Sequence, residues 1–244
     1  MAQFFILQLR PEDEAADEEY EAFLSRGGLE ALDVVRVRLD QEPAPSAEEL
    51  SEASGVIMGG GPGCVSDPPE KKTPVEAKVE AAALSIMPTI CERDIPYLGC
   101  CYGLGILTTH LGGRMGQEHY GEPVGGIDCA LTDAGREDPL LSELPQSFRA
   151  LVGHKEAVET TPDGAAHLVL SGDCPIQMIR YKSNIYGTQF HPEADGDSVA
   201  TRIHIYRNHG YFPPEEADAL IETVRHEKVT VPGEILRRFI RRYG

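Results

Sequence analysis

The stretch Tyr97–Gly105 constrains the fold more than any other part of this chain. It reads Tyr-Leu-Gly-Cys-Cys-Tyr-Gly-Leu-Gly and begins inside an apolar segment, residues 95–98. We expect a buried strand, a sharp turn at Gly-x-Cys-x-Gly and a helix to about His110, which together form a nucleophile elbow. Cys101 is the candidate nucleophile, because the N-terminus of the following helix favours a thiolate. Cys100 is predicted to point the opposite way and to pack in the core.

A second stretch, residues 189–193, reads Gln-Phe-His-Pro-Glu and supplies the partners that a nucleophile needs. Taken alone, the elbow also fits two core cysteines in a glycine-containing turn. A catalytic thiolate needs a base, and the base needs a group that orients it. In an extended segment residues i and i+2 project to the same side, so Glu193 can reach the imidazole of His191. The two stretches together predict a catalytic set of Cys101, His191 and Glu193.

A glycine-rich loop, Gly59–Gly63, follows a predicted strand at Gly55–Met58. Glycine lets the backbone approach a ligand closely with its N–H groups exposed. If this loop lies beside Cys101, one of its N–H groups and the N–H of Tyr102 can hold a developing oxyanion. The loop lacks the Gly-Lys-Ser/Thr sequence of a P-loop, which argues against a phosphate site.

These motifs resemble those of the class I (triad) glutamine amidotransferases, in particular stand-alone proteins similar to the amidotransferase domain of GMP synthase. The elbow and the Gln-Phe-His-Pro-Glu stretch carry the resemblance. Residues 56–63 are similar to the oxyanion loop of the family, and residues 154–158, His-Lys-Glu-Ala-Val, to its His-x-Asp/Glu-x-Val segment. Four motifs in the family order, between about residues 55 and 193, are specific for the superfamily but much less so for the substrate.

The resemblance implies roles for residues around the triad. It makes Gly61 the loop donor of the oxyanion hole, and it places Gly60, His154 and Gln189 at the substrate. The chain departs from the family pattern Cys-x-Gly-x-Gln, because Gly105 stands where the family has Gln. We expect this glycine to remove a group that recognises glutamine and to open space beside the nucleophile.

The predicted fold is a single α/β domain over residues 1–244. A central, mostly parallel sheet is flanked by helices, as in flavodoxin-like proteins, with a small antiparallel β segment between about residues 114 and 190 and a helical extension at about 197–244. An acidic segment, residues 12–21, predicts a helix with a solvated acidic outer face that ends at Gly27-Gly28. Thr73-Pro74-Val75-Glu76 is a capping box that begins another helix, which Pro88 should end or kink.

Composition excludes several classes of function. The chain has 40 acidic and 22 basic residues and a formal charge of −18, which disfavours nucleic-acid binding. No apolar run is long enough to cross a membrane, and the N-terminus lacks the features of a signal peptide, so we expect a cytoplasmic location. The six cysteines fit neither a disulfide framework nor a Cys-x-x-Cys zinc site. No metal or organic cofactor is implied.

The predicted function is hydrolysis of a γ-glutamyl amide such as glutamine through a Cys101 thioester, releasing glutamate and ammonia. One alternative is a γ-glutamyl peptidase or hydrolase that uses the same triad on another γ-glutamyl amide, which the glycine at position 105 favours. An alternative of another class is a non-catalytic regulatory or binding subunit that keeps the site. No synthetase domain follows the last predicted helix, so the ammonia acceptor is expected on a separate synthase chain.

Overall fold

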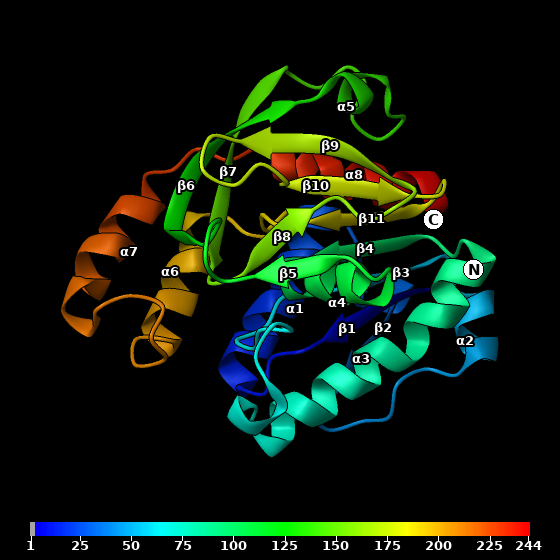
Figure 1. Cartoon of the computed structure of the whole chain (residues 1–244), viewed down its shortest axis with the longest axis horizontal. Helices are drawn as coiled ribbons and strands as arrows, with labels where there is room; N and C mark the ends of the chain where they lie inside the picture. The colour runs from blue at the N-terminus through cyan, green and yellow to red at the C-terminus, as the bar shows by residue number, and fades with distance from the viewer. Residues whose placement is uncertain (1–2) are drawn as a thin grey trace.

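The computed structural model describes residues 3–244 and is organised around one nine-stranded mixed sheet (Figure 1). Its strands are β1 (Phe4–Gln8), β2 (Val34–Arg38), β3 (Gly55–Met58), β4 (Tyr97–Cys100), β6 (Glu122–Leu131), β7 (Ser147–His154), β9 (Ala165–Ser171), β10 (Met178–Tyr181) and β11 (Ile185–Thr188). They lie in the order β2-β1-β3-β4-β11-β10-β9-β6-β7. The strands from β2 to β11 are parallel, and each later neighbour is antiparallel. The predicted α/β fold is confirmed, and the antiparallel strands extend the main sheet.

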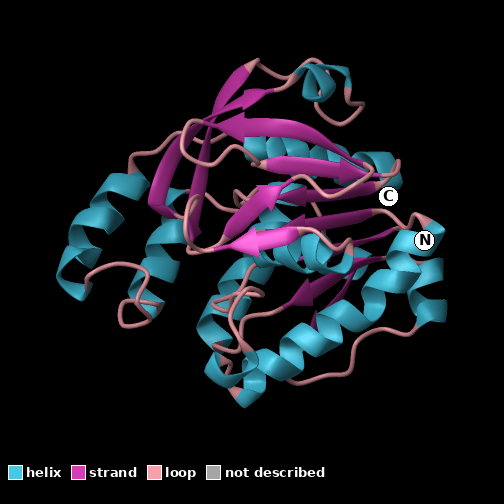
Figure 2. Cartoon of the chain, viewed as in Figure 1, coloured by secondary structure: helices cyan, strands magenta, loops and turns pink. Residues whose placement is uncertain are grey.

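Helices cover both faces of this sheet (Figure 2). They are α1 (Asp13–Gly27), α2 (Ala47–Glu52), α3 (Pro74–Arg93), α4 (Tyr102–His110), α5 (Asp133–Glu137), α6 (Gly196–Ile205), α7 (Ala217–Arg225) and α8 (Val231–Tyr243), with 3-10 turns at Ala31–Asp33, Pro69–Lys71 and Pro214–Glu216. α2, α3 and α4 pack on one face, and α1 and α8 on the other. α6 and α7 pack beside β6 and β7. Within residues 3–244, no helix is both long and apolar enough to span a membrane.

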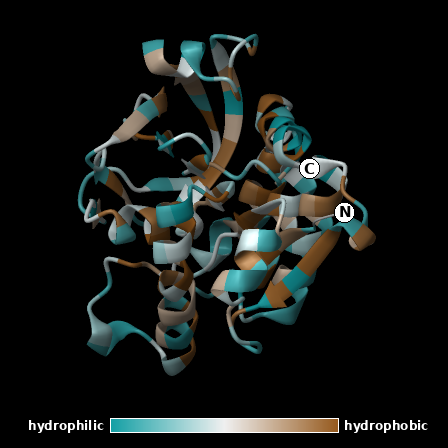
Figure 3. Ribbon diagram, turned by 90° about the vertical axis from the view of Figure 1, so that its right-hand side faces the viewer, coloured by the Kyte–Doolittle hydropathy of each residue, from teal (hydrophilic) through white to brown (hydrophobic). Residues whose placement is uncertain are grey.

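Alternation along the buried strands divides the core between the two faces. In β1, Phe5 and Leu7 join the cluster under α3 and α4, whereas Phe4 and Ile6 join the cluster under α1 and α8. Successive strand residues point to opposite faces, so a strand covered on both sides must be apolar throughout. Figure 3 shows hydrophobic residues, coloured brown, along the strands of the sheet. β1 follows this rule, since all five of its residues are buried.

The helix α3 begins as predicted but continues past its proline. The Thr73 side chain accepts a hydrogen bond from the Glu76 N–H, which confirms the capping box. We predicted that Pro88 would end or kink this helix. The helix does not end there, because it continues to Arg93. Proline removes one helical hydrogen bond. The turn beyond it buries Ile90 and other apolar residues in the core, and this burial offsets the loss.

Two short strands were not predicted. β5 (Arg114–Gly116) and β8 (Ala157–Thr160) pair antiparallel in a separate sheet, with a register shift between Arg114 and Met115. A three-residue strand carries too little alternation to be distinguished from a loop in the sequence. This small sheet matters for the site because β8 follows the His-Lys-Glu segment directly.

Candidate functional site

The candidate site lies where four neighbouring parallel strands end. Arg10 follows β1, the loop Gly59–Gly61 follows β3, Cys101 follows β4, and the segment 189–193 follows β11. Because β1, β3, β4 and β11 are adjacent and parallel, their carboxyl ends meet at one edge of the sheet. Ligand sites of open α/β sheets form at this edge. The fold thus brings the predicted site residues together from segments far apart in the chain.

Cys101 occupies the turn of the elbow in a strained backbone conformation. Its φ is 52° and its ψ is −98°, an arrangement that costs a non-glycine residue roughly 1–3 kcal/mol. Its N–H donates to the Thr188 carbonyl at 2.7 Å, which helps to hold the turn. The flanking glycines serve close packing: a Cβ on Gly99 would lie 2.6 Å from the backbone of Gly103. Cys100 is fully buried, as predicted.

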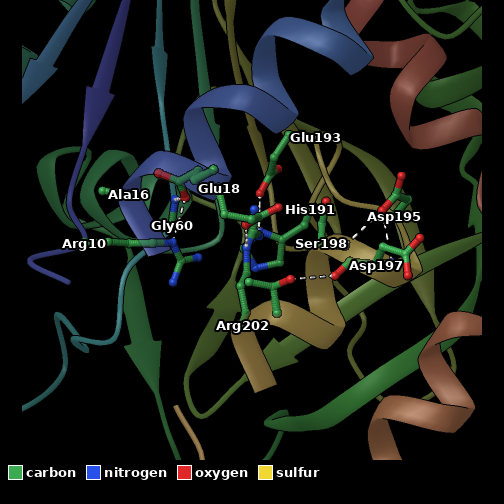
Figure 4. Close-up of polar contacts among 12 residues, drawn as sticks. Arg10, Ala16, Glu18, Gly60, His191, Glu193, Asp195, Asp197, Ser198 and Arg202 are labelled. Carbon is green, nitrogen blue, oxygen red and sulfur yellow. Dashed lines mark hydrogen bonds and ion pairs between the residues drawn. The ribbon is translucent and has the colours of Figure 1, made fainter. Parts of the chain in front are cut away.

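His191 and Glu193 form the predicted pair. His191 Nδ1 lies 2.9 Å from Glu193 Oε1, and both side chains are buried (Figure 4). Burial opposes protonation of His191, but the Glu193 carboxylate and a hydrogen bond with Cys101 outweigh it and raise the His191 pKa to about 9. Burial likewise opposes ionisation of Glu193, but His191 and a neighbouring arginine hold its pKa well below the ordinary value. The imidazole therefore stands between a thiol and a carboxylate.

That arginine is Arg202 of α6, which the sequence did not single out. Its Nη1 donates to Glu193 Oε1 at 2.7 Å, and its Nε donates to Glu18 Oε2 at 2.8 Å. Arg202 is only 7% exposed. Glu18 belongs to helix α1, and its side chain lies beside Arg202 (Figure 4). The Glu193 carboxylate thus contacts both His191 and Arg202.

Glu19 of α1 anchors the glycine-rich loop through its side chain. Its Oε1 accepts from the Gly60 N–H at 3.1 Å and from Arg10 Nε at 2.9 Å, and its side chain is fully buried. The expected solvated acidic face is therefore wrong for this residue. A signal was present in the sequence, because Glu19 lies four residues before Phe23 and so on the buried side of the helix.

Gly61 and Tyr102, the predicted oxyanion donors, line one pocket together with Cys101. The Gly60 N–H is bound by Glu19, whereas within residues 3–244 the Gly61 N–H has no hydrogen-bond partner. Tyr102 is the first residue of α4, so its N–H has no acceptor within the helix. A Cβ on Gly60 would lie 2.9 Å from His191 Cε1. Gly60 is thus needed for the loop to approach the imidazole.

Gln189 contacts the Cys101 sulfur, whereas Gly105 lies in α4 next to Glu156. Gln189 Nε2 donates to Cys101 Sγ at 3.8 Å. The expected open space at Gly105 is absent, because a Cβ there would lie 3.3 Å from Glu156 Oε1. Glu156 is buried and accepts hydrogen bonds from the backbone N–H groups of Val65 and Ser66, both at 2.9 Å. Because Gly105 has no side chain, it leaves room for the fixed carboxylate of Glu156.

The imidazole of His154 faces a buried polar cluster. Its Nε2 lies 2.8 Å from Glu122 Oε2 and its Nδ1 lies 2.9 Å from the Glu156 carbonyl. Glu122, His154 and Cys174 are close enough together to suggest a metal site. Both Glu122 oxygens, however, already accept hydrogen bonds from Gln177 or other neighbours. This bonding favours a structural role for the imidazole, which positions the backbone of Glu156.

Comparisons with known proteins agree with this geometry. Residues 20–209 match the family model described as glutamine amidotransferase class-I. The chain is 30% identical over 171 residues to a protein of Natronomonas pharaonis that is named as a subunit of glutamine-hydrolyzing GMP synthase, and the match covers 70% of this chain and 80% of that protein. It is 33% identical over 157 residues to the glutamine-hydrolyzing GMP synthase of Streptococcus pyogenes, and this match covers 61% of this chain and 26% of that protein.

Solved structures share the fold. A glutamine amidotransferase from Thermotoga maritima superposes with a TM-score of 0.75 at 21% identity, covering 100% of this chain and 99% of that one. A glutamine amidotransferase from Methylobacillus flagellatus gives a TM-score of 0.72 at 18% identity, covering 100% and 96%. The four ordered motifs, the meeting of their residues at one sheet edge and the family match lead to one conclusion: this chain belongs to the class-I glutamine amidotransferase family.

Proposed function

We propose that this chain hydrolyses a γ-glutamyl amide, with glutamine as the simplest substrate, through a thioester on Cys101. The observation that carries the proposal is the position of His191, whose Nδ1 lies 2.9 Å from Glu193 Oε1 and which lines the same pocket as Cys101. This is the relay that an activated thiol nucleophile requires. Membership of the class-I family supports the same reaction class.

The residues support the following steps. The Cys101 sulfur attacks the γ-carbonyl carbon, and the electron pair of the carbonyl moves to its oxygen, which the N–H groups of Gly61 and Tyr102 stabilise. The oxyanion re-forms the carbonyl as the C–N bond breaks, and His191 gives its proton to the departing nitrogen. Water then attacks the thioester and yields its proton to His191. Glutamate leaves, and the proton stays on His191 beside the released Cys101 thiolate, which restores the starting state.

Two electrostatic features favour this role for His191. Its pKa of about 9 keeps the imidazole protonated at neutral pH, so a proton is ready for the leaving nitrogen. The Glu193 carboxylate is buried and ionised, and it stabilises the imidazolium. A general acid–base group of this kind contributes typically about 10²–10⁴-fold to the rate.

The experiment is a glutaminase assay of the purified chain with a matched pair of cysteine variants. We expect equimolar glutamate and ammonia from glutamine, no turnover in Cys101→Ser and nearly full turnover in Cys100→Ala, because Cys100 packs in the core. A glutamine-like diazoketone should label Cys101. Label on Cys100, or activity in Cys101→Ser, would overturn the assignment. The absence of both label and turnover with any γ-glutamyl amide would favour a non-catalytic role in a larger assembly.

A separate synthase as the ammonia acceptor is a further part of the proposal. Its support is the name of the Natronomonas pharaonis relative, which is one component of a GMP synthase. The isolated chain should then release its ammonia to the solution, and a coupled enzyme that consumes ammonia should trap one equivalent per glutamate. Glutamate formed without trappable ammonia would contradict this view.

A further inference from the structure

Cys101 lines two pockets, and His191 lines the first of these but not the second. The group that protonates a leaving nitrogen must lie within hydrogen-bond reach of it. The leaving nitrogen of a bound amide, with whatever it carries, therefore lies in the first pocket, which we call the amine pocket. Its wall includes two arginines, Arg10 after β1 and Arg202 of α6. The groups that these arginines can bind decide which amine the site accepts.

Arg10 has a nitrogen that is free to bind a ligand. The residue is only 5% exposed, its Nε donates to Glu19 at 2.9 Å, and its Nη1 donates to a tyrosine hydroxyl at 3.3 Å. Within residues 3–244, its Nη2 donates no hydrogen bond. This nitrogen lies close to the reacting groups, because a Cβ on Gly60 would lie 2.8 Å from it, 2.9 Å from His191 Cε1 and 3.7 Å from Cys101 Cβ. A donor without an acceptor thus lies beside the nucleophile and its imidazole.

Arg202 has a second nitrogen of this kind. Its Nε donates to Glu18 and its Nη1 to Glu193, but its Nη2 is buried and has no hydrogen-bond partner within the described part of the chain. A guanidinium carries five N–H donors, and a buried donor without an acceptor costs free energy. Nearby side chains of the pocket wall, such as Val199 and Ile203, are apolar and cannot accept a hydrogen bond. Both arginines therefore have donors available for an acceptor on the ligand.

The charges that line the amine pocket favour a negatively charged acceptor. Three lining side chains are cationic: Arg10, Arg202 and His191, which a pKa of about 9 keeps protonated at neutral pH. Among the described residues, no aspartate or glutamate lines this pocket, and the carboxylates that pair with the cations, Glu19 and Glu193, are not part of its wall. A carboxylate on the leaving amine therefore meets charged donors. An ammonium group there would be repelled, and an alkyl group would leave the donors unpaired.

The position of Arg10 limits how far this carboxylate can lie from the leaving nitrogen. His191 must reach the nitrogen, and Arg10 Nη2 lies next to the imidazole, around the same point beside Gly60. An acceptor that binds Arg10 is therefore only a few bonds away from the nitrogen. The carboxylate of an α-amino acid meets this requirement, because a single carbon atom separates it from the nitrogen.

We infer that the preferred substrates are γ-glutamyl amino acids, in which the leaving nitrogen belongs to an α-amino acid whose carboxylate binds the guanidinium groups of Arg10 and Arg202. The inference rests on the proposed function, since it assumes the Cys101 thioester and adds the nature of the leaving group. Hydrolysis takes up one water and releases glutamate and the free amino acid, with His191 giving its proton to the nitrogen as the C–N bond breaks.

The test compares four γ-glutamyl amides in the intact chain: glutamine, γ-glutamylglycine, γ-glutamylglycinamide and γ-glutamylisobutylamide. The isobutyl group has nearly the shape of the glycine carboxymethyl group but neither its charge nor an acceptor, whereas glycinamide keeps a neutral acceptor. We expect kcat/KM to be highest for γ-glutamylglycine, intermediate for the glycinamide and about 10–100-fold lower for the isobutylamide, which is the value of a hydrogen bond to a charged group.

Two outcomes of this comparison would overturn the inference. If glutamine or the isobutylamide is hydrolysed as well as γ-glutamylglycine, the carboxylate is not recognised, and the proposed function stays intact. If none of the four amides is hydrolysed, the inference also falls, and the absence of diazoketone label on Cys101 would then overturn the proposed function with it.

A double variant tests whether Arg10 supplies this preference. Arg10→Met/Glu19→Gln removes both charges of the buried pair, so that neither is left unpaired. We expect the ratio of kcat/KM for γ-glutamylglycine to that for the isobutylamide to fall about tenfold or more. This ratio does not depend on the folded fraction of the variant, because both substrates are measured on one preparation.

Glu19→Gln alone is the matched control for the loss of Arg10. Its amide oxygen can still accept from the Gly60 N–H and from Arg10 Nε, which both donate to Glu19 Oε1 in the wild type. The control should lower turnover of both substrates alike and keep their ratio near the wild-type value. A wild-type ratio in the double variant as well would overturn the inference.

Discussion

Arg202 Nη1 lies 2.7 Å from Glu193 Oε1, the same oxygen that lies 2.9 Å from His191 Nδ1. One carboxylate oxygen thus serves a permanent cation and a titrating imidazole. Because Arg202 partly neutralises the charge of Glu193, it reduces the stabilisation that Glu193 gives to the imidazolium. At the same time it fixes the carboxylate in a buried position, where an unpaired charge would be costly.

This relationship predicts the effect of Arg202→Gln. We expect the basic limb of the pH–rate profile to move above about 9, because Glu193 then acts on His191 alone. We also expect the free energy of unfolding to fall by about 1.5–3 kcal/mol, since a buried charged hydrogen bond is lost. Arg202→Lys should cause smaller changes in both the pH–rate profile and the free energy of unfolding. Arg225→Gln removes an exposed arginine of α7 and serves as the control. A wild-type pH profile in Arg202→Gln would show that Arg202 has no influence on His191.

The Glu193→Gln variant tests the carboxylate itself. A neutral amide still accepts a hydrogen bond from His191 but does not stabilise the imidazolium, so turnover should fall by about 10²–10⁴-fold. The basic limb should shift down from about 9 toward 6.5, the ordinary histidine value. Circular dichroism should show an intact fold. Turnover that does not change, in a folded variant, would mean that Glu193 is structural only.

The raised His191 pKa also has a consequence for stability. A group whose pKa is higher in the folded state adds stability that is fully present below its unfolded value and is lost as pH rises through the folded value. For His191 this window runs from about 6.5 to about 9. The free energy of unfolding should therefore decrease over this range in the wild type. Denaturant unfolding of His191→Gln should show a smaller decrease, and identical slopes would contradict the assignment.

The proximity of the triad residues could be predicted because their signals are local. The Gly-x-Cys-x-Gly elbow and the His-Pro-Glu triplet each lie within a few residues, and a parallel sheet brings the ends of their strands together. The partners of the triad were missed for the opposite reason. Arg202 reaches Glu18 across 184 residues, and Glu19 reaches Gly60 across 41. Such pairs depend on helix packing, which periodicity does not specify.

The surroundings of the site were predicted less well where one residue type allows two interpretations. An acidic run usually marks a solvated helix face, and the acidic residues of segment 12–21 concealed the buried Glu19. A proline usually ends a helix, yet α3 passes through Pro88 because its last turn is buried. A glycine in place of a larger residue usually leaves space, but at Gly105 the space is filled by Glu156.

Glu19 is predicted to hold the oxyanion loop in place. Glu19→Ala removes the acceptor of the Gly60 N–H and leaves Arg10 buried without its carboxylate. Breaking a buried ion pair costs about 3–5 kcal/mol, so we expect a large loss of unfolding free energy. The kcat should fall as well, since the loop that carries Gly61 loses its anchor. Glu21→Ala, an exposed position on the same helix, is the control. Equal stability of the two variants would exclude the anchoring role.

The remaining prediction concerns Gly105, where family resemblance and structure disagree. The resemblance suggests that Gly105→Gln restores a missing recognition group and improves glutamine hydrolysis. The structure suggests the reverse. A Cβ at this position would lie 3.3 Å from Glu156 Oε1, and that carboxylate is held by the Ser66 hydroxyl at 2.7 Å as well as by two backbone N–H groups. A longer side chain must displace Glu156 and with it the loop beside the nucleophile.

We therefore expect Gly105→Gln to lower kcat/KM for glutamine, whereas Gly105→Ala should have a smaller effect because it adds only the Cβ. The double variant Gly105→Gln/Glu156→Ala should recover part of the loss, since residues in contact show non-additive effects of about 0.5–3 kcal/mol. The measurement is kcat/KM for glutamine across the single variants and the double variant. A single Gly105→Gln variant that hydrolyses glutamine faster than the wild type would show that Glu156 yields readily, and that the position does lack a recognition group.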